Sequence, residues 1–387
     1  MSRRPEILVL GILGQYPMAG VSWQAIHYLL GFRELGWDVW YVEDSGASPY
    51  DPVLGTRTED CTQAVRYVAD VLRRIGLPDR WAYVDLMRGE THGLSRARLD
   101  ALYRDATAIV NLCGATAPRE EHRRGPKLLY IETDPVYEQL RIALGEASSL
   151  EFLASHDALF TYGENLGAPD CPVPLVRFAW KATRPPVVLD CWPARTDAHA
   201  VFFTSIASWE NRGKDIAWEG VTYHWSKHVN FVRFLDLPRR VPQRFQLAMD
   251  PGDTSITARI RAAGWELTDP RPVSGDIDTY RDFVLGSRGE FTVAKDIYVR
   301  PNSGWFSDRS VCYLASGRPV VTMKTGFSKF YPAGEGLFEF TAEEEVLEAF
   351  RAIDRDYARH ARAARGIAEE FFASDHVLPP MLAAAGL

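Results

Sequence analysis

Short apolar runs alternate with amphipathic helical patterns along most of this chain. In the first half, each apolar run ends in a polar or glycine-containing turn, and a helical pattern at 21–35 separates the first two. The runs span residues 7–13, 37–42, 108–112, 128–131 and 158–162. This alternation is typical of βαβ units with a parallel sheet, so it predicts an α/β fold. In such a sheet, the loops that follow the strands line the ligand site.

The alternation is interrupted once and then resumes. Residues 181–199 contain three prolines and show no hydrophobic period, which indicates a linker between domains. The expected strands beyond it are 201–206, 245–249, 265–267, 290–294 and 319–323, and the expected helices are 227–235, 255–263, 277–284 and 307–315. The length of 387 residues accommodates two domains of roughly 150–200 residues each.

We therefore predict two doubly wound, Rossmann-like domains that face each other across a cleft. The first spans residues 1–185 and the second spans residues 200–372, with a linker at 186–199. The tail at 373–387 is apolar and could pack back on the N-terminal domain.

Composition and charge exclude several classes of protein. Hydrophobic residues make up 46% and charged residues 25%, which is typical of a soluble globular chain and excludes a disordered one. The net charge of −7 argues against a protein that coats duplex DNA. The five cysteines form no C-x-x-C pair, so we expect no metal cluster, no disulfide framework and a location in the reducing cytoplasm. No apolar run approaches the ~18 residues of a membrane span.

The segment 290–326 carries the densest group of candidate ligand residues. A strand runs into a Pro-Asn-Ser-Gly turn, and Ser307 or Asp308 can cap the helix that follows. Free backbone N–H groups at a helix start would suit a diphosphate. The side chains expected to assist are Lys295, Ser303, Gly304, Ser307, Asp308, Arg309 and Ser310, with Lys324 nearby. The alternative is an ordinary turn, an ordinary cap and a solvated arginine.

This part of the chain resembles the donor-binding half of GT-B glycosyltransferases. The likeness rests on the order of a strand, an SGWFSDRS helix, a YLASGRPVV strand, a TGF loop and an acidic helix, and it covers most of residues 200–372. The nearest likeness is to the bacterial glycosyltransferase family 1 group, which includes CgeB-like proteins. The resemblance implies a UDP-, GDP- or TDP-sugar donor, with Thr325 and Gly326 close to its sugar and phosphates, and no obligatory metal.

The chain departs from this family in its carboxylates. Retaining members of the glycogen-synthase-like group carry an E-x7-E motif, and the two glutamate positions are Gly304 and Cys312 here. The retaining mechanism therefore cannot be carried over, and Asp308 is the nearest acid to replace the ribose contact. A further departure lies at 204–215, where Gly-Lys-Asp matches only part of the usual cationic motif. Ser205, Arg212 and Lys214 are the candidates there, and the alternative is a solvated loop.

The N-terminal half offers acceptor-side and catalytic candidates. Gly14 and Gly20 lie in the loop after the first strand, where a backbone can approach an acceptor. An inverting transferase needs a base that takes the acceptor proton. His27 and Asp134 are the main candidates, with Asp44 and His92 weaker, although His27 could equally be a core residue and Asp134 an ordinary turn residue. Among the aromatic residues, Trp209 and Trp305 are the foremost candidates to stack on a sugar or a base.

The combined expectation is a glycosyltransferase whose acceptor is a small molecule or a glycan. A hydroxylated DNA base is a less favoured acceptor. A nucleotide-sugar epimerase of the same fold and a non-catalytic, two-lobed binding protein are the alternatives. We expect donor binding to survive in an isolated fragment of about residues 196–372. Replacing Arg309 by Ala should weaken donor binding without disturbing the fold, whereas replacing Ser307 by Ala should remove a helix cap.

Overall fold

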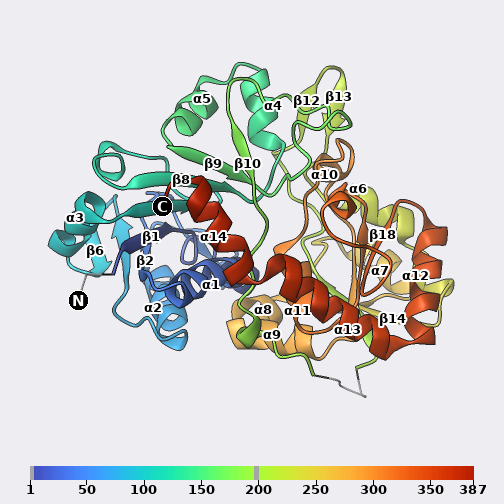
Figure 1. Ribbon diagram of the computed structural model, residues 1–387. Coiled ribbons are helices and arrows are strands. Elements are labelled where there is room, and N and C mark those ends of the chain that lie inside the picture. The colour runs from blue at the N-terminus through green and yellow to red at the C-terminus, as the bar shows by residue number, and fades with distance from the viewer. Residues whose placement is uncertain (1–3, 196–199) are drawn as a thin grey trace.

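The computed structural model describes residues 4–195 and 200–387 and contains two parallel sheets built from separate parts of the chain (Figure 1). The expected linker at 186–199 lies partly outside the described residues. The first sheet has the order β10-β9-β8-β7-β1-β2-β5-β6, in which only β6 is antiparallel. Its strands are β1 (Glu6–Leu10), β2 (Asp38–Glu43), β5 (Trp81–Asp85), β6 (Glu90–Gly93), β7 (Ala108–Leu112), β8 (Lys127–Glu132), β9 (Ala158–Thr161) and β10 (Trp180–Ala182).

The second sheet has the order β15-β14-β11-β16-β17-β18, and all its pairs are parallel. Numbered along the chain, this order is 3-2-1-4-5-6, and the same order runs from β5 to β9 in the first sheet, as in doubly wound dinucleotide-binding folds. The strands are β11 (Phe202–Ile206), β14 (Arg244–Ala248), β15 (Glu266–Thr268), β16 (Gly289–Thr292), β17 (Val320–Met323) and β18 (Leu337–Phe340). Two small hairpins lie outside the sheets, β3 (Tyr50–Asp51) with β4 (Thr56–Arg57) and β12 (Ile216–Trp218) with β13 (Val221–Tyr223).

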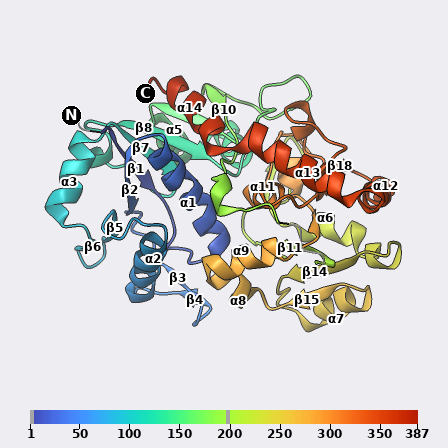
Figure 2. The same cartoon turned by 60° about the horizontal axis from the view of Figure 1, so that its bottom comes forward.

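Helices cover both faces of the sheets (Figures 1 and 2). In the first half they are α1 (Ala19–Glu34), α2 (Thr62–Arg74), α3 (Arg96–Asp105), α4 (Tyr137–Ala143) and α5 (Ala147–Ala154). In the second half they are α6 (His228–Phe231), α7 (Thr254–Ala262), α8 (Pro270–Gly275), α9 (Ile277–Leu285), α10 (Asp296–Val299), α11 (Asp308–Ala315), α12 (Glu343–Arg355), α13 (Tyr357–Ile367) and α14 (Ser374–Ala384).

The sequence of β1, EILVL, shows why the first sheet is buried on both sides. Ile7 and Val9 belong to one apolar core and Leu8 and Leu10 to another, because successive strand residues point to opposite faces. The larger core also contains Val311 and other residues from the second half of the chain. The two halves therefore share one apolar core, and the second half has a further cluster of its own that includes Phe203, Phe245 and Phe291.

The C-terminal helices cross from the second sheet back to the first (Figure 1). A Cβ at Gly31 of α1 would lie 2.6 Å from Leu378 of α14, so a glycine lets the two helices approach closely. The Lys127 ammonium donates to the carbonyl of Ala385 at 2.7 Å. The tail thus lies against the N-terminal domain.

Most expected elements are present within one to three residues of their predicted ends, but several were missed. The expected helix at 227–235 consists of the short α6 followed directly by a 3₁₀ helix at Val232–Phe234. The strands β5, β6 and β18 and the helices α2 to α5 were not predicted, and β6 has the polar sequence ETHG. Within the described residues, no helix is both long and apolar enough to cross a membrane.

Candidate functional site

A pocket opens at the carboxyl ends of β11, β14 and β16. Its volume is about 310 Å³ when the space open to solvent is included. It lies where the strand order reverses between β11 and β16, which is where doubly wound sheets bind their ligands. Apolar walls and a few polar groups line it, including Ser205, Trp209, Lys227, His228, Phe231 and Thr292. Of the predicted donor residues, Ser205 is in this lining.

Lys227 is a pocket residue that sequence reasoning missed. Its side chain is half-buried, and among the described residues its ammonium has no hydrogen-bond or ion-pair partner. Burial, followed by the positive charge of Arg309 and then that of Lys295, lowers the pKa of Lys227 well below its ordinary value, although Glu290 opposes the shift. A lysine held near other cations without a counter-ion suits an anionic ligand. In the sequence it is simply a lysine at the start of an expected helix, which is a common feature.

Lys295 joins the two domains at the ends of β16 and β8. Its ammonium donates to the Asp134 carboxylate at 2.7 Å and to the Tyr298 hydroxyl oxygen at 2.9 Å, and it lies 3.8 Å from the ring centre of Trp225. The Tyr298 hydroxyl donates to the same carboxylate. Burial would raise the pKa of Asp134, but Lys295 and Tyr298 lower it below its ordinary value. Asp134 is 44% exposed, so an ionised carboxylate that solvent can reach lies at the domain junction, and its catalytic role stays a prediction.

The turn that presents Asp134 has an unfavourable backbone conformation. Val136 has φ of +83°, which a β-branched residue rarely adopts. Its N–H donates to the Gln139 side chain at 2.7 Å, and the Gln139 amide donates to Glu132 at 2.8 Å. The Thr161 hydroxyl also donates to Glu132 at 2.6 Å, and burial raises the pKa of Glu132 to about 8. Strain that is held in place by a buried network is characteristic of functional sites.

The two cations predicted at 204–215 differ in position. Lys214 lies over the rings of Trp225 and Tyr137, with its ammonium 4.7 Å and 5.8 Å from their centres, so it sits at the junction near Asp134. Arg212 is 85% exposed and pairs with Glu210. In this structure Arg212 is therefore the solvated loop residue of the alternative interpretation.

Four of the predicted donor residues lie where the two domains meet: Ser303, Gly304, Thr325 and Gly326. The Asn165 N–H donates to the carbonyl of Ser303 at 3.0 Å, and a Cβ at Gly304 would lie 2.4 Å from the Asn165 nitrogen. The Gly304 N–H donates to the carbonyl of Thr325 at 2.6 Å. Gly326 has φ of +95° and completes the same turn. The N–H groups of Ser303 and Gly304 donate to protein carbonyls, so the geometry does not support these two as diphosphate ligands. The donor role of Thr325 and Gly326 stays a prediction.

The helix α11 begins where it was predicted, but its first residues have other partners. Ser307 is the N-cap, yet its hydroxyl accepts no backbone hydrogen bond in the described structure, so the expected cap loss in Ser307→Ala has no basis. Asp308 accepts a hydrogen bond from the Gln24 side chain of α1 at 3.0 Å and is absent from the pocket lining, so it is not placed to replace a ribose contact. Ser310 is buried and its hydroxyl is unpartnered.

Arg309 is the clearest correction. It is 11% exposed rather than solvated, and it donates to Glu290 at 2.6 Å, to the carbonyl of Ile206 at 2.8 Å and to Thr292 at 2.9 Å. Burial would lower the pKa of Arg309, but the fully buried Glu290 raises it. The Arg309 guanidinium is therefore bonded to protein groups, and it connects α11 to the second sheet.

His27 lies in the shared core and does not reach the pocket. Its Nδ1 is 3.1 Å from the N–H of Val188 and its Nε2 is 3.1 Å from the indole N–H of Trp192. Burial lowers the pKa of His27 to about 3. Because both ring nitrogens are engaged and enclosed, His27 is a core histidine and the geometry does not support it as the base.

The glycine loop after β1 wraps around a carboxylate. The N–H of Gly14 donates to Glu43 at the end of β2, and the N–H of Gln15 does so at 2.9 Å. Burial raises the pKa of Glu43 to about 7, although these hydrogen bonds oppose the shift. Gly20 lies in the first turn of α1, and a Cβ there would lie 3.6 Å from the Tyr280 ring. The acceptor-side role of these glycines stays a prediction.

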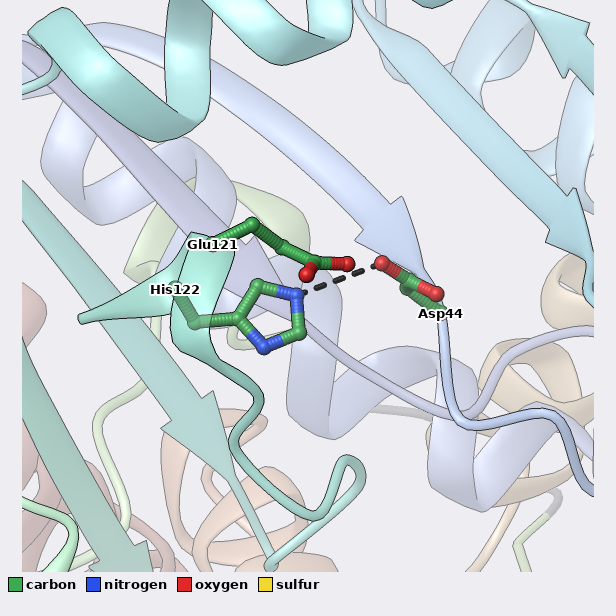
Figure 3. A group of neighbouring side chains, drawn as sticks. All are labelled: Asp44, Glu121 and His122. Atoms are coloured by element: carbon green, nitrogen blue, oxygen red, sulfur yellow. Dashed lines mark hydrogen bonds and ion pairs between the residues drawn. The ribbon is translucent and has the colours of Figure 1, made fainter. Parts of the chain in front are cut away.

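Asp44, a weaker candidate for the base, already forms hydrogen bonds and ion pairs with other side chains. Asp44 is buried, accepts from the Tyr103 hydroxyl at 2.6 Å and pairs with Arg119 and His122. With Glu121 and His122 it forms a group that could hold a cation (Figure 3). However, the Arg119 guanidinium already pairs with both carboxylates, so we interpret the group as an internal ion-pair network.

His92 and the two candidate tryptophans complete the predicted set. His92 lies on the edge strand β6, 3.7 Å from Glu90. Trp209 lines the pocket and stacks on His228, with ring centres 5.7 Å apart. Trp305 stacks on Tyr298 at 4.3 Å and donates to the carbonyl of Thr133 at 3.0 Å, so its face is already used at the junction.

No protein-family model and no curated protein sequence matches this chain. Solved structures do resemble it. An α-glucosyltransferase in complex with UDP and a 13-mer DNA containing a central A:G mismatch is 10% identical, with 100% of each chain covered and a TM-score of 0.63. Sucrose-phosphate synthase from Thermosynechococcus elongatus is 9% identical, over 99% of this chain and 98% of that chain, with a TM-score of 0.55.

A third similar structure is HepE from Anabaena in complex with UDP and glucose. It is 12% identical over 98% of this chain and 100% of that chain, with a TM-score of 0.52. At such identities the likeness concerns the fold and does not single out a CgeB-like group. It confirms the predicted fold class: the chain has the GT-B fold, with two Rossmann-like domains.

Proposed function

We propose that this protein is a glycosyltransferase that binds a nucleoside-diphosphate sugar in the pocket of the second domain. The observation that carries the proposal is the cationic edge of that pocket. Lys227 has no counter-ion among the described residues, and Lys295 and Lys214 continue the positive charge to the domain junction. Mutually repelling cations in a partly buried site are stabilised by a polyanion, and a diphosphate fits this requirement.

The proposed reaction divides between the two domains. The apolar pocket would hold the nucleobase and ribose, and the lysines would stabilise the negative charge on the departing diphosphate. Asp134 would take the proton of the acceptor hydroxyl as the hydroxyl oxygen attacks the anomeric carbon.

UDP is the nucleotide we propose, supported by the UDP found in two of the similar structures. A small-molecule or glycan acceptor, a mechanism without an obligatory metal and a cytoplasmic location stay predictions from the sequence.

The epimerase alternative is separated by its product, because an epimerase would change the sugar and leave the diphosphate intact. Turnover of a nucleotide sugar would distinguish a glycosyltransferase from the non-catalytic binding protein. Incubation with UDP-, GDP- and TDP-sugars should release nucleotide slowly even with water as acceptor. Tight binding without any turnover, with or without added acceptors, would favour a binding protein.

The donor site is tested by Lys227→Ala with Lys324→Ala as the matched control. Lys324 pairs with Glu339 at 3.3 Å and does not line the pocket. Loss of a charge-assisted contact at Lys227 should weaken UDP binding roughly ten- to a hundredfold in calorimetric titration, whereas the control should bind normally. Equal affinity of Lys227→Ala and the wild type would place the donor elsewhere.

The catalytic role is tested by Asp134→Asn. Removal of a general base should lower the rate of sugar transfer or donor hydrolysis on the order of 10²- to 10⁴-fold while UDP binding persists. An unchanged rate would exclude Asp134 as the base.

A further inference from the structure

The ion pair between Lys295 and Asp134 occupies both groups that the reaction would use. Lys295 is 15% exposed and supplies the ammonium at the junction, and Asp134 supplies the carboxylate. Their 2.7 Å contact places a cation from the opposite domain on Oδ1 of Asp134, where it weakens the carboxylate as a base. The Tyr298 hydroxyl donates to the same Oδ1 and accepts from the Lys295 ammonium.

We propose that Lys295 masks Asp134 in the donor-free protein and transfers to the donor diphosphate on binding, so that Asp134 becomes a usable base only when the donor is present. This inference rests on the proposed function. It makes Lys295 a positioning residue that couples the two domains. The acceptor proton could then be taken only in a complex that already holds the donor.

The surroundings of Lys295 favour such a transfer. Its ammonium lies on the face of Trp225 at 3.8 Å and near the ring of Tyr298 at 5.2 Å, so aromatic support remains when the end of the flexible side chain moves. A diphosphate carries more negative charge than one carboxylate and therefore competes well for the ammonium. The positive charge of Lys295 lowers the pKa of Lys227, so the two ammonium groups lie close enough to interact beside the pocket.

The transfer would change the proton affinity of Asp134. The groups that face it are Lys295, Tyr298 and Lys214, which lower its pKa, whereas burial raises it. The carboxyl groups of Asp308 and Glu132 also lie within electrostatic range. Without the Lys295 ammonium, and with a diphosphate nearby, the pKa of Asp134 rises. Donor binding should therefore be accompanied by proton uptake on Asp134 at mildly acid pH.

The test is calorimetric titration of the full chain with UDP-glucose at pH 5 to 7, in buffers of different ionisation enthalpy. UDP-glucose is chosen because its diphosphate diester carries no proton that titrates in this range. The wild type should take up a fraction of a proton that increases as the pH is lowered. Asp134→Asn should lose this uptake and bind roughly fivefold more tightly, because Lys295 is no longer held by a carboxylate. Lys295→Met should bind more weakly and also lose the uptake.

The matched control is Asp170→Asn, which removes another aspartate–lysine pair between the domains. Asp170 pairs with Lys329 at 2.5 Å, and it is not among the groups that shift the pKa of Asp134. This variant should keep both the affinity and the proton uptake of the wild type. Binding of UDP-glucose with equal proton uptake in the wild type and Asp134→Asn would overturn the masking while leaving the proposed function intact. Failure of the wild type to bind UDP-glucose would overturn the UDP-sugar donor, and the masking with it.

Discussion

At the scale of single residues, burial decides which titratable groups are available for chemistry. Asp134 stays ionised because two donors compensate its burial, whereas His27 is enclosed without a compensating charge. The imidazole is therefore neutral throughout the physiological range and contributes to the packing of the domain junction. A residue type suited to catalysis becomes a structural residue when its surroundings favour one protonation state this strongly.

His27 should make the protein sensitive to mild acid. Its pKa falls from 6.5 to about 3 on folding, so the folded state disfavours the protonated ring. The stability that neutral His27 contributes is fully present above pH 6.5 and is lost as the pH falls from 6.5 towards 3. At pH 5 the loss is about 2 kcal/mol of unfolding free energy. Urea unfolding at several pH values should show a smaller decline for His27→Gln than for the wild type, and parallel declines would contradict this account.

At the scale of elements, one charged side chain connects the start of α11 to the second sheet. Arg309 connects the helix to β16 through Glu290 and to β11 through the carbonyl of Ile206. One oxygen of Glu290 is already without a hydrogen-bond partner, so the arginine is the main compensation for this buried carboxylate. The pair therefore adds to the apolar packing that holds the helix against the sheet.

Arg309→Met should therefore destabilise the protein rather than only the complex. It leaves Glu290 as an uncompensated buried charge, which costs about 3–5 kcal/mol of unfolding free energy in urea titrations. The double variant Arg309→Met with Glu290→Leu should recover most of this loss because neither charge remains. A cost below about 1 kcal/mol together with weakened UDP binding would instead restore Arg309 as a donor ligand.

Elements formed by local periodicity could be predicted from the sequence, and those formed by context could not. The strand at 108–112 was predicted at its observed ends because a buried parallel strand is a continuous apolar run. The polar strand β6 exists because it pairs with β5, which its own sequence does not indicate. Asp134 could be selected as a candidate because it follows a strand, and its catalytic role stays a prediction. The assignment of Arg309 failed because its partner Glu290 is 19 residues away and invisible to a local pattern.

At the scale of the whole molecule, the two domains are joined by an apolar core that neither possesses alone. Trp23 and Ile26 of α1 lie in the same cluster as Val311 and Leu314 of α11, and Leu378 of α14 belongs to it as well. The Trp23 indole donates to the carbonyl of Ile277 at 2.9 Å across the junction. The expectation that an isolated fragment of about 196–372 binds the donor took the second domain to be self-sufficient, and this shared core argues against it.

The full chain should therefore unfold in a single cooperative transition. Separation of the domains would expose the buried residues of the shared core to water, and each large apolar side chain exposed costs roughly 1.5–3 kcal/mol. Neither domain should then persist after the other has melted. Differential scanning calorimetry should give one transition whose van't Hoff and calorimetric enthalpies agree. A fragment of residues 200–372 should show no cooperative transition under the same conditions. Two resolved transitions in the full chain, or a sharp one in the fragment, would mean that the second domain is stable alone and would restore the fragment as a test of donor binding.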